Sequence, residues 1–282
     1  MSGTGLFPGK QFISTVLDVL DDKAEMSGEL TRRFLMRASM AGVIIGILYA
    51  TNYAMIATFD EIPVGQETLR PIGRIFGAMA FGTALVFIYY SKSELLTSNM
   101  MIVTIGAYYR RIRLRQAGRL LGLCYLGNLV GAVCIGVPFA LSTLIDGPVG
   151  QEMALAAEHK MAYLSEGLVG TGDLFMRAVL CNFMINLAML LVYNGLIHED
   201  LTKCFVMMAS VFIFAFLGFE HSVANTVLFI IVGLHDGIQA LPALGNIGVV
   251  LIGNYVGGGL LVGLYYAYLN DDSRYLRAHS TD

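Results

Sequence analysis

Long apolar runs alternate with short charged segments along most of the chain. The run from Ala38 to Phe59 holds twenty-two residues without a formal charge, enough for a helix to cross the hydrocarbon core of a bilayer. Similar uncharged runs predict a third, a fourth and a sixth crossing at Leu120 to Ile145, Ala178 to Ile197, and Leu244 to Asn270. The pattern therefore predicts an all-α integral membrane protein.

Two further apolar stretches are each interrupted near the middle by polar residues. They extend over Ile75 to Tyr109 and Phe205 to Leu234, and the second contains the sequence from Gly218 to Asn225. The apolar halves of each stretch are too short to span a bilayer alone, whereas together they are long enough. Because a Glu, a His and an Asn at membrane depth are costly unless they face protein or a water-filled path, we interpret both stretches as transmembrane helices broken near the midplane. Ser222 is a candidate N-cap for the second half-helix of the later stretch.

The two interrupted stretches follow one pattern. A shift of 126 positions superimposes six identical residues in a single register. The matched residues are Glu94 with Glu220, Asn99 with Asn225, Gly127-Asn128 with Gly253-Asn254, and Val130-Gly131 with Val256-Gly257. This register predicts two inverted structural repeats, each with a broken helix followed by a continuous one that contains a G-N-x-V-G sequence. The expected fold has six transmembrane helices, of which the second and fifth are broken.

Composition supports a membrane protein and limits the chemistry. Hydrophobic residues make up 56% of the chain and charged residues 14%. The four cysteines lie singly in or beside apolar segments without C-x-x-C spacing, which argues against a disulfide framework and a zinc site. We expect no metal ion and no cofactor, and we expect no nucleic-acid partner.

Basic residues set the expected orientation of the helices. Five arginines lie within the ten residues from Arg110 to Arg119, and basic residues also precede the first crossing, which places both regions on the cytoplasmic side. Six crossings then return the C-terminus to the cytoplasm, in a plasma or inner membrane. The chain divides into a cytoplasmic segment at 1–30, a six-helix transmembrane domain at 31–270 and a cytoplasmic tail at 271–282.

Three features outside the interrupted stretches leave alternatives open. Apolar residues at helical spacing from Phe12 to Leu20 predict an amphipathic helix, which is either a membrane-surface anchor or a gate. Lys160, in the outward loop from Asp146 to Arg177, is either a solvated charge or an attractant for anions at an outer mouth. Asn182, in the fourth crossing, either bonds across to another helix or lines a path.

The interrupted sequences resemble those of the formate/nitrite transporter family. The resemblance rests on Phe219-Glu220-His221-Ser222 with Ala224-Asn225, on Glu94-Leu95-x-Thr97, and on Gly253-Asn254 followed by Gly257-Gly258-Gly259. It covers the chain from about residue 30 to 270. It implies a fold like that of aquaporins, assembled as a homopentamer with one pore in each protomer, and a transporter rather than an enzyme.

The resemblance also implies roles for individual residues. His221 matches the central pore histidine, and Thr97 matches the hydroxyl that faces it. The residues that match the pore constrictions are Phe81, Leu85, Leu95 and Phe214. The residues that match the polar set around the histidine and the basic residue of the outer vestibule are Glu220, Asn182, Asn254 and Lys160.

Two residues depart from the family pattern. Leu96 stands where many members have Phe, which implies a differently shaped constriction. Lys92 stands two residues before Glu94, where a small residue is common. We expect Lys92 to pair with Glu94, and the alternative is that it biases the pore toward anions.

Taken together, these residues predict a pore for small anions. Half-helices that begin near the midplane point their N–H groups inward and favour an anion there, while Thr97, Ser98 and Ser222 can satisfy the interrupted backbone and orient the ligand. Apolar rings on either side exclude hydrated ions, so a monovalent anion that can become a neutral acid suits the path. We expect a channel or proton-coupled transporter for formate, with nitrite, hydrosulfide, lactate and acetate as further candidates. In it, His221 exchanges a proton with the bound anion.

Two other functional classes fit the sequence less well. A pore for water, glycerol or ammonia would carry N-P-A sequences or paired pore histidines, and the sequence has neither. An intramembrane enzyme that uses Glu220 and His221 as acid and base would need a nucleophile or a metal cluster beside them, and the sequence indicates none.

Overall fold

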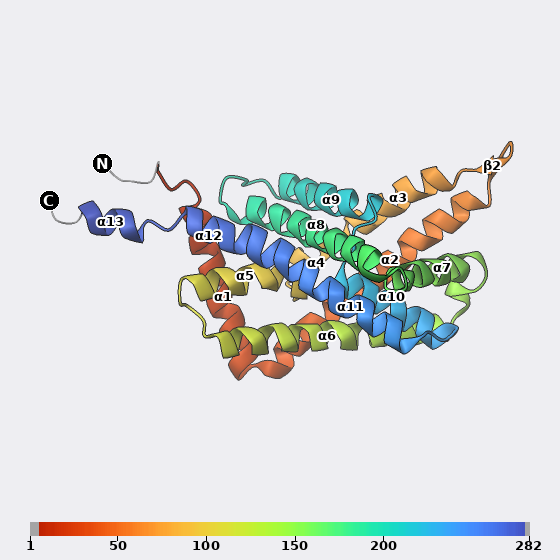
Figure 1. Ribbon diagram of the computed structural model, residues 1–282, viewed down its shortest axis with the longest axis horizontal. Coiled ribbons are helices and arrows are strands. Elements are labelled where there is room, and N and C mark those ends of the chain that lie inside the picture. Colours follow the sequence, from red (N-terminus) through yellow and green to blue (C-terminus); the bar gives the residue numbers. More distant parts are fainter. Residues whose placement is uncertain (1–5, 280–282) are drawn as a thin grey trace.

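The computed structural model describes residues 6–279, and most of them are helical (Figure 1). The helices are α1 (Lys10–Glu29), α2 (Thr31–Asp60), α3 (Arg70–Gly82), α4 (Ala84–Tyr90), α5 (Leu96–Tyr108), α6 (Leu114–Ala140), α7 (Pro148–Ala162), α8 (Gly167–Tyr193), α9 (Asp200–Phe216), α10 (Ser222–His235), α11 (Ala240–Asn254), α12 (Tyr265–Leu269) and α13 (Ser273–His279). A π-helical segment, Tyr255–Leu264, joins α11 to α12, and one turn of 3-10 helix, Thr143–Ile145, precedes α7. The strands β1 (Pro63–Val64) and β2 (Glu67–Thr68) form an antiparallel hairpin after α2.

Five helical stretches of the described chain are long and apolar enough to cross a membrane. They are Thr31–Asp60, Arg70–Tyr90, Leu114–Ala140, Gly167–Tyr193 and Ala240–Leu269. Each overlaps a crossing that the sequence predicts. Helices α9 and α10, which make up the predicted fifth crossing, have only 17 and 14 residues. The protein is therefore a helical membrane protein with several apolar spanning helices.

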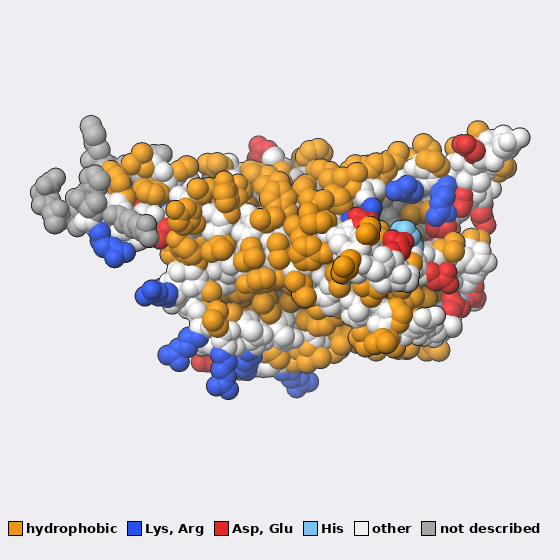
Figure 2. All heavy atoms as spheres, viewed as in Figure 1, with side chains coloured by type: hydrophobic (Ala, Val, Ile, Leu, Met, Phe, Trp, Pro, Cys, Tyr) orange, Lys and Arg blue, Asp and Glu red, His pale blue; other side chains and the backbone are white. Residues whose placement is uncertain are grey.

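Apolar side chains cover the middle of the face shown in Figure 2. Exposed apolar side chains of the described chain include Ile252 and Tyr268, which are 63% and 66% exposed, as expected for a surface that faces lipid. Charged side chains gather beyond this apolar region at both ends (Figure 2). Helices α1 and α13 lie at one end, and α7 and the β-hairpin lie at the other (Figure 1).

The chain leaves helical geometry between α4 and α5 and again between α9 and α10. Each of these two linkers turns at a residue with positive φ, Lys92 at 56° and Gly218 at 69°. Glycine adopts this conformation at little cost, whereas it is uncommon for lysine. Each linker then ends in an extended residue, Leu95 before α5 and His221 before α10. These linkers coincide with the polar interruptions in the sequence.

The N-cap of α10 is His221, so the prediction that Ser222 caps this helix is wrong. The Nδ1 atom of His221 accepts a hydrogen bond from the backbone N–H of Ala224 at 3.1 Å. Ser222 is the first residue of the helix, and its buried hydroxyl has no hydrogen-bond partner within residues 6–279. The extended backbone conformation that an N-cap needs falls one residue earlier than the sequence suggests, and the imidazole takes the role of the usual short polar side chain.

A buried asparagine holds the first linker. Asn128 on α6 accepts a hydrogen bond from the backbone N–H of Leu96 at 3.1 Å. Its amide nitrogen donates to the carbonyls of Ala38 and Glu94, both at 2.8 Å. One side chain thus satisfies three backbone groups at a depth where water does not replace a missing partner.

The repeat-related asparagine holds the second linker in the same way. Asn254 on α11 accepts a hydrogen bond from the backbone N–H of Ser222 at 2.9 Å. Its amide nitrogen donates to the carbonyls of Ala178 and Glu220 at 2.8 and 2.9 Å. The register of 126 positions in the sequence therefore corresponds to matching contacts in the structure.

Candidate functional site

His221 and Thr97 meet where α10 and α5 begin. Thr97 Oγ1 and His221 Nε2 are 3.1 Å apart, and both side chains are buried. Because Nδ1 accepts the N–H of Ala224, it carries no hydrogen, and the ring is the neutral tautomer with its hydrogen on Nε2. Nε2–H therefore donates to the hydroxyl of Thr97. The structure brings together the two residues that the sequence pairs.

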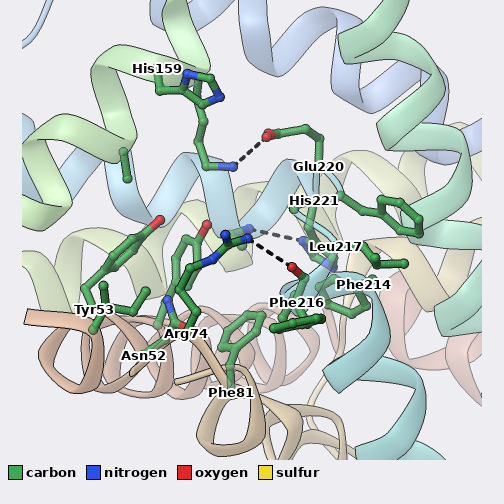
Figure 3. A pocket seen from close by; sticks show the side chains of 18 of the residues that line it. Asn52, Tyr53, Arg74, Phe81, His159, Phe214, Phe216, Leu217, Glu220 and His221 are labelled. Carbon is green, nitrogen blue, oxygen red and sulfur yellow. Dashed lines mark hydrogen bonds and ion pairs between the residues drawn. The ribbon is translucent and has the colours of Figure 1, made fainter. Parts of the chain in front are cut away.

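Three cavities follow one another past this pair. The first, which we name the α7-side cavity, has a volume of about 380 Å³ and is shown in Figure 3. The second, the central chamber, has a volume of about 20 Å³. The third, the α1-side cavity, has a volume of about 530 Å³. They form a series because each shares lining residues with the next.

Aromatic rings separate the α7-side cavity from the central chamber. Phe81 of α3 and Phe214 of α9 line both cavities, and their ring centroids lie 6.1 Å apart at an interplanar angle of 89° (Figure 3). The imidazole of His221 also lines both and stacks on Phe214 with centroids 6.1 Å apart. Two of the predicted constriction residues thus lie at this boundary. We name Phe81 and Phe214 together the aromatic ring, meaning a ring of side chains around the path.

Aliphatic side chains separate the central chamber from the α1-side cavity. Leu85, Ile88 and Leu95 line both, and we name them the aliphatic ring. Ile88 was not predicted, although its spacing from Phe81 and Leu85 follows one face of a helix and could have indicated it. Within the lining of the chamber, His221 is the sole polar side chain.

A buried ion pair lies beside the α7-side cavity. Lys160 Nζ and Glu220 Oε1 are 2.8 Å apart, and the two residues are 8% and 3% exposed. Lys160 is therefore not a solvated charge, which was one of the two sequence-based interpretations. Asn225 donates to the other carboxylate oxygen of Glu220 at 2.6 Å and to Asn246 Oδ1 at 2.9 Å, and Asn246 donates to the carbonyl of Lys160 at 2.7 Å. The sequence did not point to Asn246, which sits outside both repeat motifs.

The related carboxylate on the α1 side pairs with a lysine from the N-terminal helix. Glu94 forms an ion pair with Lys23 of α1 and accepts a hydrogen bond from Asn99 at 3.1 Å. The prediction that Lys92 pairs with Glu94 is wrong. Lys92 is exposed, and its ammonium lies 5.1 Å from the centre of the Tyr89 ring, where it stays hydrated.

Helix α1 packs against the core at this end. Phe12 and Leu20 on its apolar face are buried, and a Cβ on Gly106 of α5 would lie 2.0 Å from the Leu20 side chain. Outside the spanning segments, Arg111 in the α5–α6 connection forms an ion pair at 2.8 Å with Asp21 of α1. The hydrogen bond that Arg111 donates lowers the pKa of Asp21 below its usual value. The predicted amphipathic helix is therefore packed against the core, and its residues form part of the wall of the α1-side cavity.

Two of the predicted polar residues bind backbone rather than face a cavity. Asn182 donates to the carbonyls of Thr97 and Asn254 at 3.1 and 2.7 Å, so it bonds across helices. Neither Asn182 nor Asn254 lines any of the three cavities within residues 6–279. Asn186, one turn after Asn182, was not predicted, although it donates to the same Thr97 carbonyl at 3.2 Å. Its place one helical turn from a buried amide was the available signal.

The remaining predicted residues lie close to this path. Ser98 lines the α1-side cavity. Leu96 is buried, and its side chain lines none of the three cavities in the described chain, so its departure from the family pattern acts through packing. In residues 6–279, no three His, Cys, Asp or Glu side chains come together to hold a metal ion.

Three proteins with similar sequences are named as transporters or channels. The chain is 32% identical over 246 residues to the uncharacterized transporter YwcJ of Bacillus subtilis strain 168, which covers 85% of this chain and 90% of that protein. It is 29% identical over 252 residues to the nitrite transporter NirC of Escherichia coli K12, covering 87% and 86% of the two chains. It is 28% identical over 263 residues to the formate channel FocA of the same strain, covering 84% and 87%.

Solved structures with a similar fold are channels. An FNT family ion channel superposes with a TM-score of 0.76 at 23% identity, over 92% of this chain and 98% of that one. A pentameric formate channel with formate bound superposes with a TM-score of 0.67 at 21% identity, over 86% and 98%. At these identities the likeness concerns the fold.

The family model described as formate/nitrite transporter matches residues 10–268, nearly the whole described chain. The match includes α1 as well as both linkers, and it confirms the resemblance found in the sequence motifs. The chain belongs to the formate/nitrite transporter family.

Proposed function

We propose that the protein is a channel or proton-coupled transporter for small monovalent anions of weak acids, with formate as its substrate and nitrite or hydrosulfide as the alternatives. The observation that carries the proposal is the central chamber, where one imidazole is the sole polar side chain between two larger cavities lined by charged residues. The family, the two relatives named for nitrite and formate, and the fold shared with a formate-bound channel support this choice of anions.

In this proposal the chain crosses the membrane six times in two inverted repeats. The stretch Arg70–Tyr90 with α5 forms the second crossing, and α9 with α10 forms the fifth. The arginines from Arg110 to Arg119 favour a cytoplasmic location for the α1 side and both termini. With this orientation, the α7-side cavity opens on the outside of a plasma or inner membrane. Five protomers assemble, each with its own pore, as the pentameric state of the similar formate channel suggests.

An anion entering from the α7 side meets a cavity lined by ion pairs and by Arg74, and then an apolar barrier. Helices α5 and α10 begin beside the central chamber, so their N–H groups and dipoles favour negative charge there. Between the aromatic and aliphatic rings, a carboxylate that lost its hydration would cost several kcal/mol, whereas the neutral acid passes at much lower cost. Transport through the chamber therefore depends on a proton that reaches the anion.

The hydrogen bonds of His221 determine how that proton is delivered. The neutral ring can donate a hydrogen bond from Nε2, but it cannot give up that hydrogen without becoming an imidazolate. Proton delivery therefore requires the imidazolium, in which Nδ1 also carries a hydrogen. That N–H would face the backbone N–H of Ala224, and two donors cannot form a hydrogen bond with each other. Proton exchange and helix capping exclude each other, so the ring must leave Ala224 when it takes up a second proton.

The variant His221→Asn tests this role because Asn is a favoured N-cap residue that cannot exchange a proton. We expect the variant to fold and its formate flux to lose its dependence on pH, leaving only a passive anion leak. Formate uptake into liposomes is measured between about pH 5 and 8 for both proteins. His235→Asn, which removes an imidazole outside the three cavities, serves as the control and should keep the wild-type profile. Identical pH profiles for wild type and His221→Asn would show that His221 does not exchange a proton with the anion.

The choice of anion has its own measurement. Uptake of labelled formate, nitrite, hydrosulfide and lactate by the same liposomes ranks the substrates. A clear preference for nitrite or hydrosulfide would replace formate within the same mechanism. Flux of water or ammonia without any anion flux would replace the whole proposal with a neutral-solute pore.

A further inference from the structure

Four cationic side chains line the α7-side cavity, and three of them are neutralised. Arg70 pairs with Glu152 and Asp60, Lys160 pairs with Glu220, and Arg177 pairs with Asp173. The fourth, Arg74, forms no ion pair with a carboxylate among residues 6–279. The positive charge without a partner in this cavity therefore belongs to Arg74.

The guanidinium of Arg74 is oriented by its surroundings and keeps most of its donors free. Its Nη2 donates to the carbonyl of Phe216 at 3.3 Å, and its Cζ lies 5.8 Å from the centre of the Phe216 ring. A guanidinium has five N–H donors, of which this contact uses one. Figure 3 shows Arg74 reaching into the cavity from below, toward the linker that carries Glu220 and His221.

Arg177, which lines the same cavity, differs from Arg74 in this respect. Its Nε donates to both carboxylate oxygens of Asp173 at 3.0 Å, and its Nη1 donates to the carbonyl of Gly218 at 3.1 Å. It also lies over the ring of Tyr163. Arg177 therefore acts as a fixed support for the linker, whereas Arg74 can receive a ligand.

We propose that Arg74 is an outer capture site that binds small planar oxyanions, carboxylates or nitrite, through two parallel N–H donors before they reach Lys160 and the aromatic ring. This inference rests on the proposed function. The planar fork of arginine matches two oxygens of one anion, whereas an ammonium offers a point charge. A cavity of about 380 Å³ holds such an anion with water, and Phe216 beneath the guanidinium keeps the fork in position. Arg74 therefore selects for oxyanions, which offer two acceptor oxygens, over anions with a single acceptor atom such as hydrosulfide.

Two substitutions at Arg74 separate charge from shape. Arg74→Gln should raise the concentration for half-maximal uptake of formate and nitrite by about two- to fivefold, the range expected for an exposed ion pair, with the maximal rate unchanged. Arg74→Lys should raise it nearly as much for formate and nitrite but leave hydrosulfide near wild type. Arg119→Gln is the matched control. Arg119, like Arg74, donates to a backbone carbonyl, and it donates to a hydroxyl as well, but it lies at the α1 end. It should change none of these values for anions added on the α7 side.

Several outcomes would overturn the inference. Wild-type behaviour of Arg74→Gln would show that the guanidinium takes no part, and full recovery of formate uptake by Arg74→Lys would show that a point charge suffices. An equal loss of maximal rate for all anions in both variants would assign Arg74 to support of the linker instead.

A binding measurement on the wild-type protein is independent of transport. Phenylglyoxal modifies free guanidinium groups, and mass spectrometry reports the rate at each arginine. Formate, compared with chloride at equal ionic strength, should slow modification of Arg74 and leave Arg119 unaffected. Protection of Arg74 in a protein that moves no anion would uphold the site and refute the proposed function. Anion flux without protection would refute the site alone.

Discussion

The regions around Glu94 and Glu220, which we name the α1-side and α7-side half-sites, share a hydrogen-bonded backbone scaffold. They differ in the side chains that this scaffold presents. In both, an asparagine five residues later donates to the carboxylate, and a second asparagine holds the linker backbone. The residue that ends the linker differs, since Leu95 stands 126 positions before His221. The repeated scaffold thus presents an apolar side chain on one side and an imidazole on the other.

The cations that neutralise the two carboxylates also differ in origin. Lys23 comes from α1, before the first repeat, and Lys160 comes from α7, between the repeats. No shift of 126 positions relates them. The repeats therefore supply the buried carboxylates and the paired backbone, whereas elements added outside the repeats supply the balancing charge. This difference predicts unequal consequences when each half-site is broken.

The largest effect is expected at the α7-side half-site. Lys160→Met leaves the carboxylate of Glu220 buried without its ion-pair partner, which should lower the free energy of unfolding by about 3–5 kcal/mol. Thermal unfolding of the detergent-solubilised protein measures the loss. The double variant Lys160→Met/Glu220→Gln removes both charges and should recover most of it. A double variant as unstable as the single one would assign the loss to packing of the lysine stem.

A smaller effect is expected from the same change at the α1-side half-site. The side chain of Lys23 is 15% exposed, against 10% for the side chain of Lys160, so water can reach Glu94 more easily once the ammonium is gone. We expect Lys23→Met to cost about 1–3 kcal/mol in the same unfolding measurement. Lys92→Met is the control, because Lys92 does not pair with Glu94, and it should leave stability unchanged. Equal losses from Lys23→Met and Lys160→Met would mean that both half-sites are closed to water to the same degree.

The smallest effect concerns selectivity at the two rings. Phe214→Ala removes an aromatic side chain from the ring nearer the α7 side and should raise the lactate-to-formate uptake ratio by about tenfold. Leu95→Ala removes a smaller side chain from the aliphatic ring and should raise the ratio less. Leu96→Ala, whose side chain lines no cavity in the described chain, should leave it unchanged. An unaltered ratio in both ring variants would place the selective barrier elsewhere.

Much of the scaffold could be predicted because its signals are local or periodic. Apolar runs indicate spanning helices, and a polar interruption that recurs at a fixed shift indicates a repeat. The pairing of His221 with Thr97 followed from motif resemblance, since nothing in their spacing places them 3.1 Å apart. The two rings followed in the same way, except for Ile88, which only helix periodicity could have added.

The parts that the sequence did not predict depend on contacts between distant segments. Lys23 reaches Glu94 only because α1 packs against α5, and no local pattern favours Lys23 over Lys92, which lies two residues before Glu94. The cap of α10 depends on which residue becomes extended after Gly218, a matter of backbone geometry. Arg74 has no carboxylate partner among residues 6–279 because the nearby carboxylates pair with Arg70, Lys160 and Arg177, an arrangement that composition does not reveal.

The size of the central chamber has a consequence for the energy stored across the membrane. A volume of about 20 Å³ has room for one water-sized molecule, and its walls offer a single polar side chain to bind it. A space for about one water does not hold a continuous file of several waters, along which protons would hop. In the proposed mechanism protons therefore cross only when an anion crosses with them, and an idle protomer does not dissipate the proton gradient.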